Sequence, residues 1–184
     1  QEIWQSPFKF AKNPNHTNLQ TAQEILDSSD WKLQGRQRVN QKTGQILKFT
    51  LLLNSSAMQK VALPYQKQLK KIGIRMDIQL LSPSDWISRI QKFNFDMTTF
   101  NWSVSNSPVS QPFLYWHSSQ KSISGSNNII GMQNSAVDDI TEKIKTTENM
   151  QEKIDLMQAL DRILMWNYTV IPHWYIDYDR VAYW

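Results

Sequence analysis

Apolar positions along this chain repeat with two different periods, and each period predicts a different element. From Ile74 to Leu80 apolar and polar residues alternate, which is typical of a half-buried strand. The run from Ile46 to Leu53 is apolar enough to predict a strand buried on both faces. Between Asn18 and Ser29 the apolar residues return every three or four positions, which predicts a helix. The chain therefore contains both strands and helices.

A helix is predicted between the first two strands, from Met58 to Ile72, with Gly73 suited to the left-handed conformation that follows a helix. Pro64 interrupts this pattern, because proline inside a helix removes a backbone hydrogen bond and costs about 3 kcal/mol. Two alternatives follow: the helix begins near Ala62, or it bends at Pro64. We favour the bend.

The next segment repeats the strand and helix alternation. Ser82-Pro83-Ser84-Asp85 carries a capping serine, a proline for the first helical position and an acid in the first turn, so a helix is predicted through Phe93. The alternating segment Phe95 to Trp102 is predicted as the third strand. Three strands joined by two helices predict a mostly parallel sheet flanked by helices, and the fold class is therefore α/β.

The C-terminal half is predicted to be mainly helical. A helix is expected from Ser135 to Thr146 after Asn134 as the capping residue, and another from Met150 to Asn167. The polar segment from Ser118 to Asn128 is predicted as a surface loop. A late strand is predicted from Thr169 to Tyr175.

Composition limits the class of protein. With 184 residues, 40% of them hydrophobic, eight Trp and only five Gly, the chain is expected to fold as one domain or one large lobe. No apolar run approaches the ~18 residues that span a bilayer, so we expect a soluble chain. It begins without Met or a signal peptide, from which we expect a longer precursor, shortened by processing or by the choice of segment.

Cysteine and charge add two exclusions. The absence of cysteine rules out disulfides and thiolate chemistry, while leaving cytosol and periplasm both open. The net charge of +4 is spread along the chain, and its densest cluster falls at helical spacing around Lys67 to Arg75. This cluster predicts a solvated helix face rather than a nucleic-acid interface.

A search for catalytic chemistry finds no candidate. His16, His117 and His173 lie far apart without carboxylates at ligand spacing, so neither a metal nor another cofactor is predicted. No nucleophile motif is present. The acids Asp138 and Asp139 fall in the opening turn of a helix, where they favour the helix dipole, and the acids at 177 and 179 read as a solvated turn. The chain is not predicted to be an enzyme.

Polar and aromatic side chains gather after the third strand. Ligands of parallel α/β sheets bind beyond the carboxyl ends of strands, so we interpret this cluster as the wall of a ligand site. The alternative for Trp102 and Trp116 is burial in the core. The candidate residues of the loop and its surroundings are Trp102, Ser103, Ser105, Asn106, Tyr115, Trp116 and His117.

Several segments, in their order, resemble a known family. They are the helix at 18–31, Leu69 to Ile74, Phe95-Asp96-Met97, Trp102, the stretch from Asn128 to Asp138 and the end from Pro172 to Trp184. In this order the chain resembles the C-terminal lobe of the family-5, or cluster C, solute-binding proteins of oligopeptide-type ABC importers. Leu160 to Asn167 and Ile171 to Tyr175 are most similar to the YejA-like subfamily.

The resemblance implies one lobe of a two-lobed periplasmic binding protein of type II. Residues 1–168 would form the ligand-binding lobe, with Asn128 matching a family pattern beside its surface, and residues 169–184 a hinge or return strand toward an N-terminal lobe. Implied partners are a peptide or peptide-like ligand, that N-terminal lobe and an ABC permease in the membrane, and the implied location is the bacterial periplasm. The alternative is a receptor or interaction module that keeps the fold without transport.

The sequence departs from the family at one informative place. Dipeptide- and oligopeptide-binding relatives typically carry an acid shortly after the Trp of this strand, which pairs with the ligand ammonium. Here Ser103 to Pro108 contains no acid. A buried charge needs a partner, so either the other lobe supplies one or the ligand is not a free peptide.

Overall fold

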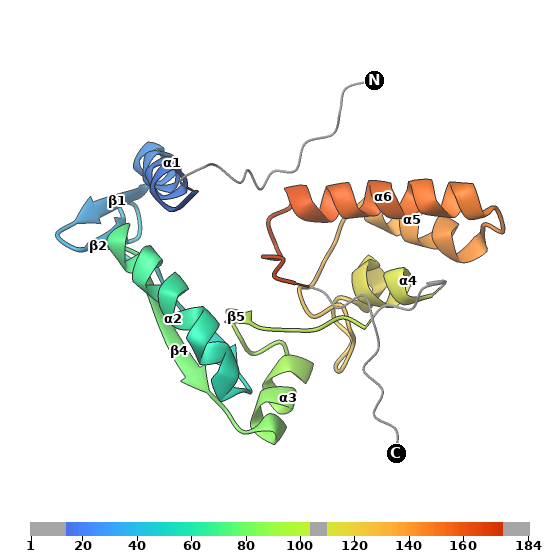
Figure 1. Ribbon diagram of the computed structural model, residues 1–184, viewed down its shortest axis with the longest axis horizontal. Helices are drawn as coiled ribbons and strands as arrows, with labels where there is room; N and C mark the ends of the chain where they lie inside the picture. The colour runs from blue at the N-terminus through green and yellow to red at the C-terminus, as the bar shows by residue number, and fades with distance from the viewer. Residues whose placement is uncertain (1–13, 104–109, 175–184) are drawn as a thin grey trace, which may run out of the picture.

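A computed structural model describes residues 14–103 and 110–174, with side chains from residue 18 onward. The described chain has two regions, which Figure 1 shows side by side. We call residues 14–103 the sheet region and residues 110–174 the helical region. Each region has a buried apolar cluster of its own.

Three parallel strands form the centre of the sheet region, in the order β4-β3-β5. Strand β3 (Lys48–Leu53) pairs along its whole length with β4 (Arg75–Leu80), and β5 (Met97–Thr98) pairs with Leu51 and Leu52 on its other side. Helix α2 (Ser56–Lys71) connects β3 to β4, and α3 (Pro83–Gln91) connects β4 to β5. The predicted α/β fold with a parallel sheet and flanking helices is confirmed.

Helix α2 passes through Pro64 without a break. It begins at Ser56, after Ser55, whose hydroxyl accepts a hydrogen bond from the backbone N–H of Ala57. The alternative start near Ala62 is therefore wrong. Apolar residues of its inner side, including Ala62 and Leu69, join Leu51, Leu53 and Met76 in the core of the sheet region.

Strand β5 is much shorter than the predicted strand from Phe95 to Trp102, because side chains replace backbone pairing at both of its ends. The carboxylate of Asp96 accepts a hydrogen bond from the N–H of Thr50 at 2.9 Å. The hydroxyl of Thr98 donates to the carbonyl of Leu52 at 3.0 Å. With these groups of β3 satisfied, the chain leaves the sheet after Thr98.

The N-terminal end of the sheet region contains the predicted first helix and a hairpin that was not predicted. Helix α1 (Pro14–Ser28) is followed by an antiparallel hairpin of β1 (Trp31–Gln34) and β2 (Gln37–Asn40). The side chain of Arg38 is only 1% exposed. It forms an ion pair with Asp27 of α1 and donates to the carbonyl of Ile72 at 3.0 Å. This buried arginine fastens the hairpin to two helices.

The helical region consists of α4 (Gln111–Trp116), a short 3-10 helix η1 (Ser118–Gln120), α5 (Ser135–Thr146) and α6 (Met150–Trp166). Asn134 caps α5 as predicted, accepting hydrogen bonds from the N–H groups of Ala136 and Val137. Helix α5 lies against both α4 and α6 (Figure 1). Their core is formed by Met132, Val137, Ile144 and Leu160.

The predicted strand from Thr169 to Tyr175 is wrong for residues 169–174, which form no strand; Tyr175 lies outside the described residues. A strand needs a neighbour for its backbone groups, and none of the described strands pairs with this segment. Large apolar side chains near it are exposed: Trp166, Tyr168, Ile171 and Trp174.

Among the described residues, no helix combines the length and apolar character needed to cross a membrane.

Candidate ligand-binding site

A row of four aromatic rings connects the two regions. Trp86 of α3 stacks on Phe100 with ring centroids 6.1 Å apart, and Phe100 meets Trp102 edge-on at 5.1 Å. Trp102 in turn packs against Trp116 of α4 at 5.0 Å. The row begins beside β5, where the Trp86 ring nitrogen donates to the Thr98 hydroxyl at 2.9 Å. We call these four residues the aromatic row.

Trp102 is therefore held from several sides. Its ring lies between Phe100 and Trp116, and its ring nitrogen donates to the carbonyl of Asn127 at 3.4 Å. It remains half-buried, and the neighbouring Ser103 is exposed. A ring fixed in this way keeps its exposed part in one place, which suits a rigid wall for a ligand.

The structure brings most of the candidate residues together. The Tyr115 hydroxyl donates to the Ser103 carbonyl at 2.6 Å, and Trp116 contacts Trp102. The cluster therefore spans the exit of β5 and helix α4, as expected from the sequence. Ser105 and Asn106 lie outside the described residues.

His117 is engaged by the protein on both ring nitrogens. Its Nδ1 accepts a hydrogen bond from the Ser119 N–H at 3.1 Å, while its Nε2 lies 3.9 Å from a carboxylate oxygen of Asp138 and 4.0 Å from one of Glu142. The ring also stacks on Phe113, with centroids 4.3 Å apart. These contacts orient the imidazole toward α5. Within the described part of the chain, no three residues form a metal-binding group.

Asp138 does more than face the dipole of α5. Its carboxylate accepts two hydrogen bonds from Ser118, from the N–H at 2.7 Å and from the hydroxyl at 2.5 Å. Desolvation by partial burial acts to raise the pKa of Asp138, but the Ser118 hydrogen bonds, with a smaller contribution from nearby His117, outweigh it and lower the pKa below its ordinary value. The carboxylate thus fixes the segment after α4 to α5.

Asn128 is fully buried, unlike the other candidates. Its side-chain amide donates to the carbonyls of His117 and Met132, both at 3.1 Å, and its carbonyl accepts from the Met132 N–H at 2.8 Å. A side chain with no exposed surface offers little to a ligand. Its position favours a structural role, in which it holds the loop against the end of α4.

Several residues of this site were missed in the sequence. Phe100 lies two positions before Trp102, so the period of two could have placed both rings on one side of the chain. Phe113 and the Ser118–Asp138 contact left no such signal, because their partners lie in different segments. Lys145 of α5 covers the Phe113 ring, with its amine 4.6 Å from the centroid.

Comparison with known families identifies the class of protein. Residues 1–124 match the family described as bacterial extracellular solute-binding proteins, family 5 Middle. This match covers more than half of the chain. The chain therefore belongs to the family-5 bacterial extracellular solute-binding proteins.

Two curated relatives and one solved structure refine this assignment. The chain is 35% identical to the "uncharacterized protein YejA" of Escherichia coli K12 over 184 residues, all of this chain and 30% of the relative. It is 36% identical to the "probable peptide-binding protein YejA" of Agrobacterium fabrum over 167 residues, 91% of this chain and 27% of the relative. The chain thus spans less than a third of the length of these relatives.

The fold is similar to that of a solved oligopeptide-binding protein. The Bacillus subtilis protein AppA, solved in complex with a nonapeptide, superposes with a TM-score of 0.75 at 22% identity. The match covers 92% of this chain and 32% of AppA. The described fold is therefore similar to that of about a third of AppA.

Proposed function

We propose that this chain is the C-terminal, ligand-binding lobe of a solute-binding protein that captures peptides or peptide-like solutes for an ABC importer. The observation that carries the proposal is the fixed, half-buried Trp102 beside exposed Ser103 at the carboxyl end of a parallel strand. Such strand ends are where α/β folds bind ligands. The name of the Agrobacterium relative, a probable peptide-binding protein, supports the same solute class.

In this proposal Trp102, Tyr115, Trp116 and His117 provide ring surfaces, and Ser103, Ser105 and Asn106 provide polar groups for a peptide backbone. The contact between the rings of Trp102 and Trp116 supports treating them as one binding surface. In the same proposal Tyr115 also positions Ser103, and the hydrogen bond from its hydroxyl to the Ser103 carbonyl supports this. We leave buried Asn128 out of the ligand contacts.

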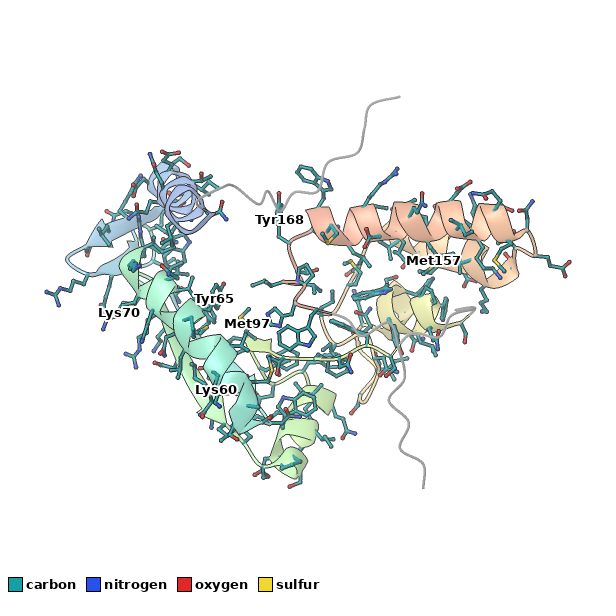
Figure 2. The ribbon with its side chains drawn as sticks, in the orientation of Figure 1. Lys60, Tyr65, Lys70, Met97, Met157 and Tyr168 are labelled. Atoms are coloured by element: carbon teal, nitrogen blue, oxygen red, sulfur yellow. The ribbon has the colours of Figure 1, made fainter. Side chains whose placement is uncertain are left out.

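A second part of the proposal concerns the rest of the protein. Residues 1–168 would form the lobe, and residues 169–184 the return strand to an N-terminal lobe. The exposed apolar side chains of Trp166, Tyr168, Ile171 and Trp174 support this, because large exposed apolar groups mark interaction surfaces. Figure 2 shows Tyr168 just beyond the end of α6, at the edge of the helical region.

The proposed setting is the bacterial periplasm, where the ligand-bound protein would deliver its solute to a membrane permease. The family description as extracellular supports export. The relatives are described as binding proteins rather than enzymes, and the proposed role includes no chemical step.

Native mass spectrometry of the full-length protein tests the proposal. Gently purified protein is expected to carry a peptide-sized adduct, which the 184-residue chain alone loses because one wall of the site is absent. Protein that stays bare after challenge with a peptide mixture would contradict peptide capture. If it then enriches a protein partner but no permease, the interaction module is favoured instead.

Replacing Trp102 locates the site within this lobe. Trp102→Ala is expected to weaken peptide binding by the full-length protein by about tenfold or more, the usual effect of removing a central aromatic contact. Trp102→Phe is the matched control, since it keeps a ring between Phe100 and Trp116 and is expected to retain most of the affinity. Unchanged affinity in a folded Trp102→Ala protein would contradict the assignment, whereas unfolding would favour the core interpretation.

A further inference from the structure

A small open pocket lies between α4 and α6, and it shares Tyr115 and Trp116 with the candidate ligand-binding site. Its volume is about 130 Å³. Its walls are mostly apolar: Pro112, Tyr115 and Trp116 from α4, and Met157, Leu160 and Leu164 from α6. Figure 2 labels Met157 on α6 in the helical region. The residues that α6 contributes to this pocket have no part in the candidate ligand-binding site described above.

The size of the pocket suits one apolar side chain. An engineered cavity of about 150 Å³ with apolar walls binds benzene, so 130 Å³ admits a group close to that size. Leu160, one of the lining residues, is only 2% exposed and belongs to the core of the helical region. This part of the wall is therefore firm, while the pocket is open toward solvent.

A negative charge stands at the same pocket. Asp161 follows Leu160 on α6 and contributes to the lining, yet it remains exposed. Within the described part of the chain, its carboxylate has no hydrogen bond or ion pair. The rings of Tyr115 and Trp116 line the same pocket, and the faces of such rings also attract a cation.

We propose that this pocket binds an apolar side chain, aromatic or branched aliphatic, whose neighbouring positively charged nitrogen pairs with Asp161. The inference rests on the proposed function and narrows the class of solute. The selected solutes would be peptides in which an apolar residue lies beside an amine. Charge complementarity determines which apolar group is selected. Apolar walls alone accept any apolar group, whereas the carboxylate of Asp161 favours a group that carries a positive charge.

Three small probes separate the two parts of this recognition. Phenylalanine amide carries a ring and an ammonium group, N-acetylphenylalanine amide carries the ring without the charge, and glycine amide carries the charge without the ring. We would follow the methyl signals of Met157 and Leu164 by NMR on the 184-residue chain while titrating each probe.

Phenylalanine amide is expected to give saturable shifts and to bind about three to five times more tightly than the acetylated probe, as an exposed ion pair allows. Glycine amide is expected to give none. Asp161→Asn should remove the preference for the charged probe while keeping the ring bound, and Leu164→Trp should fill the pocket and abolish both. Asp139→Asn, an exposed carboxylate of α5 outside the pocket, serves as the matched control and should change nothing.

Absence of saturable shifts in folded protein would overturn the proposal, and so would equal binding of the charged and uncharged ring probes. Peptide binding by the full-length protein is a separate readout. If peptides bind there while Asp161→Asn and Leu164→Trp leave their affinity unchanged, the pocket is wrong and peptide capture stands. If no peptide binds but phenylalanine amide saturates the pocket, the pocket stands and peptide capture falls.

Discussion

The sheet region and the helical region are held together by different kinds of contact. In the sheet region, β3 shares backbone hydrogen bonds with strands on both sides, and its residues Leu51, Leu52 and Leu53 are almost completely buried. In the helical region the backbone hydrogen bonds lie within the individual helices, and the segments between the helices are fixed by single side chains such as Asn128 and Asp138. Most of the described candidate site residues lie in this helical region.

The two regions therefore differ in how many substitutions we expect them to tolerate. A parallel strand buried on both faces tolerates few changes, since each residue is packed on two sides. Loops held by one or two side chains can vary as long as those side chains remain. The aromatic row joins the two regions, so Trp102 stands on a firm base while facing a loop.

The largest effect is expected in the sheet region, from Arg38→Met. This change leaves the carbonyls of Ile72 and Trp31 without their buried donor and removes the ion pair with Asp27, and it should cost about 3 to 5 kcal/mol in the free energy of unfolding. Hydrogen exchange resolved by residue would show whether protection falls in the sheet region alone. Arg36→Met, an exposed neighbour, is the control.

If protection in α5 and α6 falls equally in Arg38→Met, the two regions form one cooperative unit and are not stabilised independently. If the helical region keeps its protection, the two cores unfold separately.

The corresponding change in the helical region is Asn128→Ala. It leaves the carbonyl and the N–H of Met132 without partners and removes one of the two donors to the carbonyl of His117, so we expect a loss of about 3 kcal/mol. Thermal and denaturant unfolding would measure it. The exposed neighbour provides the control, Asn127→Ala, because only the backbone carbonyl of Asn127 contacts Trp102. Equal stability of the two variants would contradict the structural role of Asn128.

Gly73→Ala tests the close packing of the hairpin against the end of α2. Gly73 has a φ of +84°, and an added Cβ would lie 3.2 Å from the backbone nitrogen of Arg38 and 2.8 Å from a methyl carbon of Leu33. We expect a loss of about 2 to 3 kcal/mol from backbone strain and crowding. Gly44→Ala has a similar φ of +71° with no atom nearby, so it isolates the strain.

A Gly73→Ala protein no less stable than Gly44→Ala would show that the hairpin is not packed closely against this glycine. Chemical denaturation of both variants decides the matter.

The smallest effect concerns the pH dependence of Asp138. Because its pKa is lowered in the folded protein, its contribution to stability is fully present above the ordinary value of 3.8 and is lost as the pH falls through the lower folded value. Asp138→Asn should therefore flatten the acid side of the stability profile while changing stability at neutral pH by about 1 kcal/mol or less. Asp139→Asn is the control. Parallel profiles for wild type and Asp138→Asn would contradict this account.

Much of the fold could be predicted because its elements carry regular patterns. Alternation revealed β4, a continuous apolar run revealed β3, and a capping asparagine placed the start of α5 at Ser135. The hairpin of β1 and β2 was missed because its strands are short and largely polar, although Gly35 at its turn was a usable signal.

That several candidate residues lie together could be predicted, but their contacts could not, and their role in ligand binding stays a prediction. Aromatic and polar residues after the third strand indicated the place, and Trp102, Tyr115 and Trp116 do lie together. The roles of Asn128 and Asp138 could not be predicted, since hydrogen bonds between residues 11 or 20 positions apart leave no period in the sequence. The early end of β5 was hidden for the same reason, because the side chains of Asp96 and Thr98 act as ladder partners.

The way β5 ends has a consequence for how this fold can diversify. Asp96 and Thr98 complete the hydrogen bonds of β3 with their own side chains, so the sheet is finished before the chain reaches Trp102. Insertions and substitutions beyond Thr99 then leave the strand register untouched. Evolution, or a randomised library, can therefore change this exit segment while the scaffold beneath it stays the same.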